Sequence, residues 1–222
     1  MPSGEEREPV VAQELEAQLA HPLQLAFNVF LFAIFGAVAA HETYVVWREG
    51  RLDFVEVSFA VQNAIMVALV LLRRPHRAVE RDPFRQAIAI AAFLSGALFM
   101  GEPATSSEGA RLASKIVVLA SNVLGLLTLL NLGRSFGILI ALRKVETRFL
   151  YSVVRHPMYG TDILLRIGFL VSHLSPFTAA LFVLSTGCYV LRALSEERFL
   201  SSDPAYREYM QRVRWRFIPG LC

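Results

Sequence analysis

Long apolar blocks separated by short polar segments dominate the pattern along this chain. Four of them approach the length of a membrane-spanning helix, which needs about 20 mostly apolar residues. These blocks are Pro22 to Ala40, Phe54 to Leu72, Gln86 to Gly101 and Leu112 to Leu132. A longer stretch, Tyr159 to Leu194, exceeds one helix, and Ser175-Pro176 interrupts it with a turn signal. The pattern therefore predicts six spans, of which the last two form a helical hairpin.

The distribution of positive charge supports this count, because cytoplasmic loops close to the spans collect Lys and Arg. With six spans, the N-terminus, the 73–85 loop, the 133–157 loop and the C-terminal tail share one side and carry most of the 22 Lys and Arg. The loops on the opposite side contain only Arg48, Arg51, Arg111 and Lys115. Omitting the short third block would place both major basic regions outside the cell. We therefore expect a multi-pass protein with both termini in the cytoplasm.

Composition agrees with a membrane protein, since 55% of the residues are hydrophobic and 18% are charged, against about 45–50% and 25% in soluble domains. A net charge of +3 is too small for a nucleic-acid-binding surface. The two cysteines, Cys188 and Cys222, cannot build a disulfide framework or a Cys-based metal site, and we expect no metal. Arg far outnumbers Lys, which suggests a GC-rich genome and hence a bacterial cytoplasmic membrane.

We expect one all-α membrane domain over residues 1–222. It comprises a polar cytoplasmic N-terminus at 1–21, a four-span part at 22–132 and a C-terminal part at 133–222 with a cytoplasmic helical tail. The N-terminus is acidic through Glu16, which is the opposite of a basic leader, so no cleaved signal is expected.

The segment Arg155-His156-Pro157-Met158-Tyr159 lies where a basic loop enters the fifth span. Pro157 suits the first turn of a helix, where its missing N–H costs nothing, and His156 would then be the cap residue. The positive end of the helix could hold an anionic group there. The alternative is an interfacial anchor made of Arg, His and Tyr.

Polar residues at helical spacing form a stripe on each of the last two spans. On the fifth span they are Tyr159, Asp162, Arg166 and His173; on the sixth they are Ser185, Tyr189, Arg192 and Glu196. Ionisable groups at this depth cost several kcal/mol unless they face a cavity or one another. Two interpretations follow: a polar chamber open to the cytoplasm, or a structural seam in which Asp162 pairs with Arg166 and Arg192 with Glu196.

Aromatic and basic residues alternate in the tail after the last span, through 203–209 and 212–219. This pattern is typical of a helix lying on an anionic membrane surface. The same segment could also close a pocket from below.

Three motifs in this order resemble the isoprenylcysteine carboxyl methyltransferase and phospholipid methyltransferase superfamily of membrane enzymes. They are Leu132-Gly133-Arg134-Ser135-Phe136, then Arg155-His156-Pro157-Met158-Tyr159, then Glu196-Glu197 followed by Tyr206, Tyr209, Val213 and Pro219. The resemblance covers roughly residues 130 to 220. One departure is Arg148-Phe149-Leu150-Tyr151, where many members have Gly-Pro or a similar turn before the Tyr.

The resemblance implies S-adenosylmethionine as methyl donor, bound on the cytoplasmic side, with a lipophilic acceptor that enters from the bilayer. Carried over by position, the cofactor-binding residues would be Arg155, His156, Pro157, Tyr159, Glu196, Glu197, Tyr206 and Tyr209. Arg166 or Arg192 could hold an acceptor carboxylate by bidentate hydrogen bonds, and His156 or a Glu such as Glu196 could accept a proton. We list Arg166, Arg192 and Glu196 as candidate catalytic residues.

We therefore expect an isoprenylcysteine carboxyl methyltransferase-like enzyme that acts on a lipid or a lipophilic small molecule among membrane lipids, without nucleic acid. A phospholipid amine N-methyltransferase is a second reading. A third is a non-catalytic membrane scaffold or transporter subunit that keeps its polar hairpin for folding.

Overall fold

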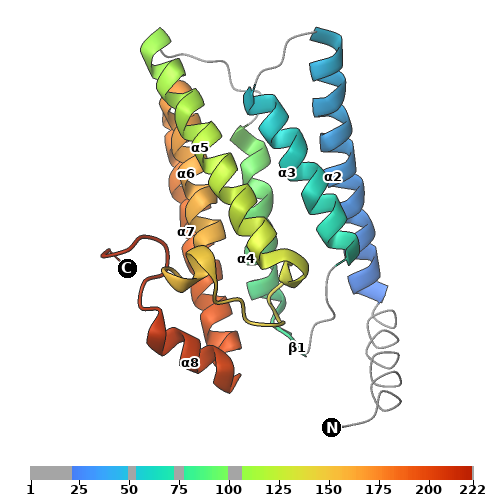
Figure 1. Cartoon of the computed structure of the whole chain (residues 1–222), viewed down its shortest axis with the longest axis vertical. Helices are drawn as coiled ribbons and strands as arrows, with labels where there is room; N and C mark the ends of the chain where they lie inside the picture. The colour runs from blue at the N-terminus through green and yellow to red at the C-terminus, as the bar shows by residue number, and fades with distance from the viewer. Residues whose placement is uncertain (1–21, 50–53, 73–77, 100–106, 222) are drawn as a thin grey trace.

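The computed structural model describes residues 22–49, 54–72, 78–99 and 107–221, and these ranges are mostly helical (Figure 1). The α-helices are α2 (Pro22–Glu49), α3 (Phe54–Leu72), α4 (Pro83–Leu94), α5 (Glu108–Leu132), α6 (Pro157–Ser172), α7 (Pro176–Leu200) and α8 (Pro204–Arg212). Short 3-10 helices are η1 (Ser95–Phe99), η2 (Gly133–Ser135) and η3 (Phe149–Ser152). The predicted helical fold is confirmed. The polar N-terminus 1–21, Arg51 and Gly101 lie outside the described residues.

Helices α2 to α7 run side by side in alternating directions, and α8 lies across the end of α7 (Figure 1). Two of the described segments are long and apolar enough to cross a membrane: Glu108–Ser135, which is α5 with η2, and Pro176–Leu200, which is α7. The apolar stretches of α2, α3 and α4 are shorter. These helices support membrane association, and the six-span topology stays a prediction.

The helix boundaries follow the apolar blocks with two differences. Helix α2 continues beyond the predicted Ala40 to Glu49, because main-chain hydrogen bonding can extend past the apolar residues that identify a span. The third block, predicted over Gln86 to Gly101, forms α4 from Pro83 to Leu94 and then the tighter η1. Helix α3 matches its prediction, Phe54 to Leu72.

Five of the described helices begin with a proline: α2, α4, α6, α7 and α8. In α7, Ser175 and Thr178 form a capping box: the Ser175 hydroxyl accepts from the Thr178 N–H at 3.1 Å, and the Thr178 hydroxyl accepts from the Ser175 N–H at 2.9 Å. Such a box satisfies two main-chain donors that the helix start leaves unpaired. The predicted break at Ser175-Pro176 is confirmed.

The helices of the predicted hairpin pack more closely on other helices than on each other. Helix α6 packs mainly on α5, and α7 packs mainly on α4. A Cβ added at Gly168 of α6 would lie 2.7 Å from Val118 Cγ2 of α5, so only glycine permits this approach of the two helices. Helices α6 and α7 do contact each other, as the predicted hairpin requires, but this looser contact leaves room between their polar stripes.

An irregular segment between η2 and η3 folds under the bundle and lies against α4. Its short strand β2 (Ala141–Leu142) pairs antiparallel with β1 (Ala78–Val79), which adds a small sheet to the expected all-α fold. The side chain of Gln86 fixes this segment further, since its Nε2 donates to Ile140 O at 3.1 Å and its Oε1 accepts from Ile140 N at 3.0 Å. Ile138 and Phe136 of the segment join the apolar core formed by α2, α3 and α5.

Candidate active site

A cavity of about 340 Å³ lies among α2, α3, α4, α6, α7, α8 and the 136–146 segment. This volume is in the range of small-molecule sites. The residues predicted for the site that line it are Arg155, His156, Tyr159, Arg166, Arg192, Glu196, Tyr206 and Tyr209. Pro157 and Glu197 are not among the lining residues: Pro157 lines a separate groove, and Glu197 is buried beside the cavity. The structure therefore brings most of the predicted residues to one cavity.

The polar stripes of α6 and α7 meet across the mouth of this cavity. Tyr159 donates to Glu196 Oε1 at 2.5 Å, and Arg192 Nε donates to the same oxygen at 3.2 Å. The Arg192 guanidinium also lies 4.9 Å from the centre of the Tyr159 ring, within cation–π range. Two partners thus fix Oε1 of Glu196, and this carboxylate lines the cavity together with the Arg192 guanidinium that it pairs with.

Both buried arginines of the stripes donate to main-chain carbonyls of α4. Arg192 Nη1 donates to Ala89 O at 3.0 Å, and its Nη2 donates to Ile138 O at 2.7 Å. Arg166 Nη2 donates to Ala92 O at 3.3 Å, close to the end of α4, where helix carbonyls lack partners within the helix. The two arginines therefore hold α4 against α6 and α7 as well as lining the cavity.

The two interpretations of the stripes each describe part of the structure. Arg192 and Glu196 form the predicted pair, with 3.2 Å between Nε and Oε1. Arg166 instead donates to the main-chain carbonyl of Asp162 at 2.9 Å, while the Asp162 carboxylate accepts from Tyr189 at 2.6 Å. Residues of the two stripes thus form hydrogen bonds and an ion pair with one another and also line the cavity.

Two members of the predicted stripes lie away from the cavity. His173 caps the end of α6, where its Nδ1 lies 2.6 Å from Ser172 Oγ. The Ser185 hydroxyl donates to the carbonyl of Phe182 one turn earlier in its own helix, at 3.1 Å. Their inclusion in the chamber was wrong, because equal spacing on a helix does not ensure equal depth or a partner across the gap.

Glu197 is the centre of a buried cluster beneath the cavity mouth. Its carboxylate lies 3.2 Å from His156 Nε2, 3.3 Å from Arg155 Nε and 3.0 Å from Arg216 Nε. The Arg155 Nε–H makes no hydrogen bond, so that pair is held by charge alone. With 5% of its surface exposed, Glu197 orients His156 instead of lining the cavity.

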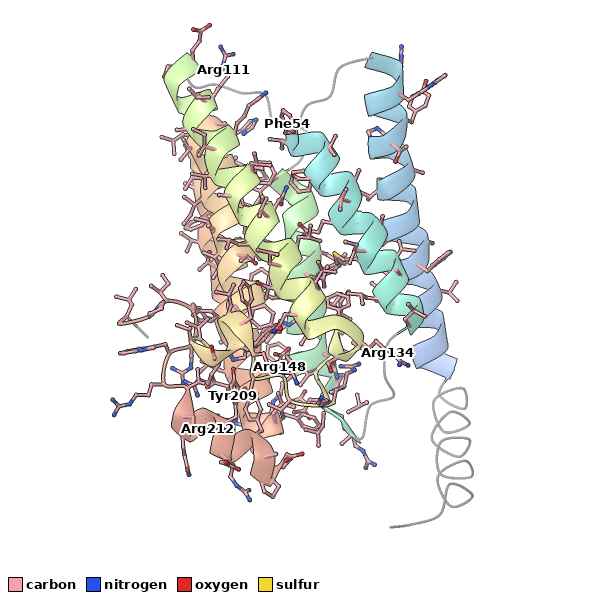
Figure 2. The ribbon with its side chains drawn as sticks, viewed as in Figure 1. Phe54, Arg111, Arg134, Arg148, Tyr209 and Arg212 are labelled. Carbon is pink, nitrogen blue, oxygen red and sulfur yellow. The ribbon has the colours of Figure 1, made fainter. Side chains whose placement is uncertain are left out.

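The C-terminal tail is tied to the signature segment by its main chain. Arg155 N donates to Trp215 O and His156 N donates to Arg216 O, both at 2.8 Å. In α8, the Tyr209 hydroxyl donates to Tyr151 O at 2.7 Å, and burial raises the pKa of Tyr209 well above its usual value, so it stays a donor. The tail closes the cavity from below, near the end where Figure 2 labels Tyr209 and Arg212.

Residues 111–206 match the family model described as phospholipid methyltransferase. The region is therefore similar to a family of methyltransferases. The resemblance deduced from the three motifs is confirmed there, and the match begins earlier than the motifs did, since it includes most of α5. It ends at Tyr206, so Tyr209 and the tail lie beyond it. No curated protein matches the chain.

The structure adds residues that the sequence did not single out. Arg143 lines the cavity, and a Cβ at Gly137 would lie 2.5 Å from its Nη1. Gly137 directly follows the first motif, and this glycine is the sequence signal that could have indicated a close contact there. Phe149, in the segment that departs from the resemblance, has φ 53°, a conformation that glycine adopts freely. The apolar lining from α2 and α3, such as Ile34 and Phe59, has no motif and could not be found from sequence.

Proposed function

We propose that this protein transfers a methyl group from S-adenosylmethionine to a lipophilic acceptor at the cytoplasmic face of a bacterial membrane, which it crosses with α2 to α7. The observation that carries the proposal is the lining of the cavity. At the α8 end it is ionisable and aromatic, with His156, Glu196 and Tyr206. The lining from α2 and α3 is mainly apolar: it consists of Ile34, Val38, Phe59 and Met66, with the uncharged polar residues Gln62 and Asn63. One cavity thus has a polar end, suited to the methyl donor, and a mainly apolar part, suited to a lipophilic acceptor.

The residues at the polar end fit the methyl donor. When bound, S-adenosylmethionine supplies a methyl group on a positively charged sulfur, together with an adenosine and an amino-acid moiety. The carboxylate of Glu196 would favour the cationic parts, and Tyr206 and Tyr209 would cover the bound molecule from α8. Burial raises the pKa of Tyr206 and of Tyr209, so neither hydroxyl adds negative charge at neutral pH.

The apolar part would bind the acceptor chain and exclude water. Methyl transfer depends mainly on alignment of donor and acceptor in a desolvated site, which the rigid α4–α6–α7 framework can provide. A carboxylate acceptor needs no base, whereas an amine or thiol must lose a proton. His156 is placed for that role, because its Nδ1 lies 3.9 Å from Glu196 Oε2 and its other nitrogen is oriented by Glu197.

A phospholipid amine is the second candidate acceptor, favoured by the description of the matching family. Headgroup methylation and methyl-ester formation give different products. Mass spectrometry of lipids from cells with and without the gene separates them: added methyl groups on an amine headgroup would support the second candidate, and a new methyl ester the first.

Donor binding tests the proposal directly. Isothermal titration calorimetry of the full chain in lipid nanodiscs should show S-adenosylmethionine binding, and His156→Ala should weaken it at least about tenfold. His41→Ala is a matched control, because His41 in α2 is exposed and does not line the cavity. Absence of binding heat at high micromolar donor would instead favour the non-catalytic scaffold.

Acceptor turnover tests the candidate role of Arg166. Arg166→Leu should reduce turnover while donor binding persists, if this guanidinium holds the acceptor. Normal turnover would make Arg166 purely structural, consistent with its bond to Ala92 O.

A further inference from the structure

A second hollow lies on a different face of α6 from the cavity. It measures about 310 Å³ and is bordered by α5, η3, α6 and the tail. Its lining residues are Leu124, Leu150, Val153, Val154, Pro157, Gly160, Thr161, Ile163, Leu164, Ile167, Phe217, Ile218 and Pro219. None of them lines the first cavity, so this groove is a separate feature. Apart from Thr161, its side chains are apolar.

The length and position of the groove fit a lipid acyl chain. Along α6 its lining extends from Pro157 to Ile167, ten residue steps that rise about 15 Å at 1.5 Å per step. The hydrocarbon core of a bilayer is about 30 Å thick, so one leaflet contributes about 15 Å. The groove begins at the tail, where α6 begins, and extends along the helix as a chain of that leaflet would.

Basic residues lie close in the sequence to the residues that line the tail end of the groove. Arg214 and Arg216 precede the lining residue Phe217, and Arg148 precedes the lining residue Leu150. Arg216 is paired with Glu197. Arg148 and Arg214 are exposed, and Arg148 Nε lies 3.9 Å from Glu146 Oε1. No acidic residue lines the groove. An apolar groove with exposed cations at the headgroup level is complementary to a lipid with a negatively charged headgroup.

We propose that this groove binds one acyl chain of an anionic phospholipid, whose phosphate lies near Arg214 and Arg148. The lipid acts as a support for the tail, because Phe217, Ile218 and Pro219 form one wall of the groove. The neighbouring Trp215 and Arg216 carbonyls hold Arg155 and His156. Occupation of the groove would thus stabilise the tail in the position that closes the cavity. This lipid is distinct from the methyl acceptor, which the first cavity would bind.

Tryptophan fluorescence offers a direct test, because the chain has two tryptophans. Trp215 lies in the tail and is 37% exposed, whereas Trp47 is 78% exposed near the far end of α2. The Trp47→Phe chain, reconstituted at low salt, therefore reports from the groove rim. Phosphatidylglycerol with brominated acyl chains should quench Trp215 at about fivefold lower mole fraction than brominated phosphatidylcholine.

Matched variants locate the headgroup. Arg214→Gln should raise the mole fraction needed for half quenching by phosphatidylglycerol about fivefold, from roughly 1 kcal/mol per basic residue near an anionic surface. Arg111→Gln should leave it unchanged, since Arg111 lies at the opposite end of the molecule (Figure 2). Ile167→Phe, which narrows the deep end of the groove, should weaken quenching without altering headgroup charge.

Equal quenching by the two lipids, or equal effects of the two arginine substitutions, would overturn the proposal in favour of a non-selective lipid shell. Neither donor nor acceptor is present in these measurements. A failure of the groove proposal is thus distinguishable from a failure of the proposed methyl transfer, which the calorimetry tests.

Discussion

Helix α6 has two faces with opposite designs. Toward α5 it has small residues: Gly168 approaches Val118, and the Ser114 hydroxyl donates to Gly168 O at 2.7 Å. Toward α7 it has Tyr159 and Asp162, which reach their partners through side-chain hydrogen bonds across a cavity. Close helix packing through small residues is how membrane helices associate. The comparison shows that one face fixes the position of α6 so that the other can remain open.

The largest expected effect is at Glu197, in the buried cluster beside the cavity. Glu197→Gln would leave Arg155, His156 and Arg216 without their shared carboxylate, and removal of one member of a buried ionic group costs about 3 kcal/mol or more. We expect the tail to loosen, so that limited proteolysis cleaves it near Arg216 more readily and donor affinity falls. Unchanged cleavage and affinity would contradict the role of Glu197 as the anchor of the tail.

One added methyl group on the face of α6 that packs on α5 should destabilise the folded protein. In Gly168→Ala the new Cβ would lie 2.7 Å from Val118 Cγ2 and 3.2 Å from Val118 N, and overpacking of this kind costs about 1–3 kcal/mol. Thermal unfolding in detergent should show a lower midpoint. Gly187→Ala in α7 is the matched control, because nothing lies within 4 Å of its added Cβ. Equal midpoints for the two variants would mean that α5 and α6 are not closely packed.

A smaller effect on stability is expected where α8 contacts η3. Tyr209→Phe removes the hydrogen bond to Tyr151 O, 2.7 Å long and buried, and leaves a carbonyl unsatisfied at a cost of about 1–1.5 kcal/mol. Hydrogen exchange should accelerate in η3 while α5 keeps its protection. Uniform acceleration in both would show global destabilisation instead of a local contact.

The smallest expected effect is on the pH dependence of stability. It concerns Glu80, which lies outside both faces of α6. Burial acts to raise the pKa of Glu80, but its hydrogen bonds from Asp82 N and Arg85 Nη1 outweigh this, and the pKa is lowered. A lowered pKa in the folded state adds stability at neutral pH that is lost as the pH falls through the acidic range. Glu80→Gln should therefore flatten the acid side of the stability profile, by less than about 1 kcal/mol. An unaltered profile would show that Glu80 is not held by these bonds.

Much of the helix pattern could be predicted because its causes are local. Apolar blocks mark α3 and α5, and the Ser175-Pro176 pair marks the start of α7 through a cap whose partners are three residues apart. The same holds for Pro157 in the first turn of α6. The order of the three motifs also sufficed to indicate the family, since residues 111–206 match it.

The partners of the site residues could not be predicted in the same way. Glu196 and Glu197 are adjacent in the sequence, yet one lines the cavity and the other is buried against Arg216. Arg166 and Arg192 were expected to hold a ligand or to pair with a carboxylate of their own helix, yet both also donate to carbonyls of α4. Helical spacing gives the direction of a side chain relative to its own axis, but the neighbour it meets depends on how distant segments pack.

The sequence by itself therefore determined which stretches are helical and apolar, where they are capped, and which chemistry they resemble, because these depend on residues a few positions apart. Only the tertiary structure decided that α6 packs on α5 and leaves a gap toward α7, and that the tail folds back onto the signature segment. Those arrangements depend on contacts between residues tens of positions apart, where the steric fit of single side chains such as Gly168 selects one packing.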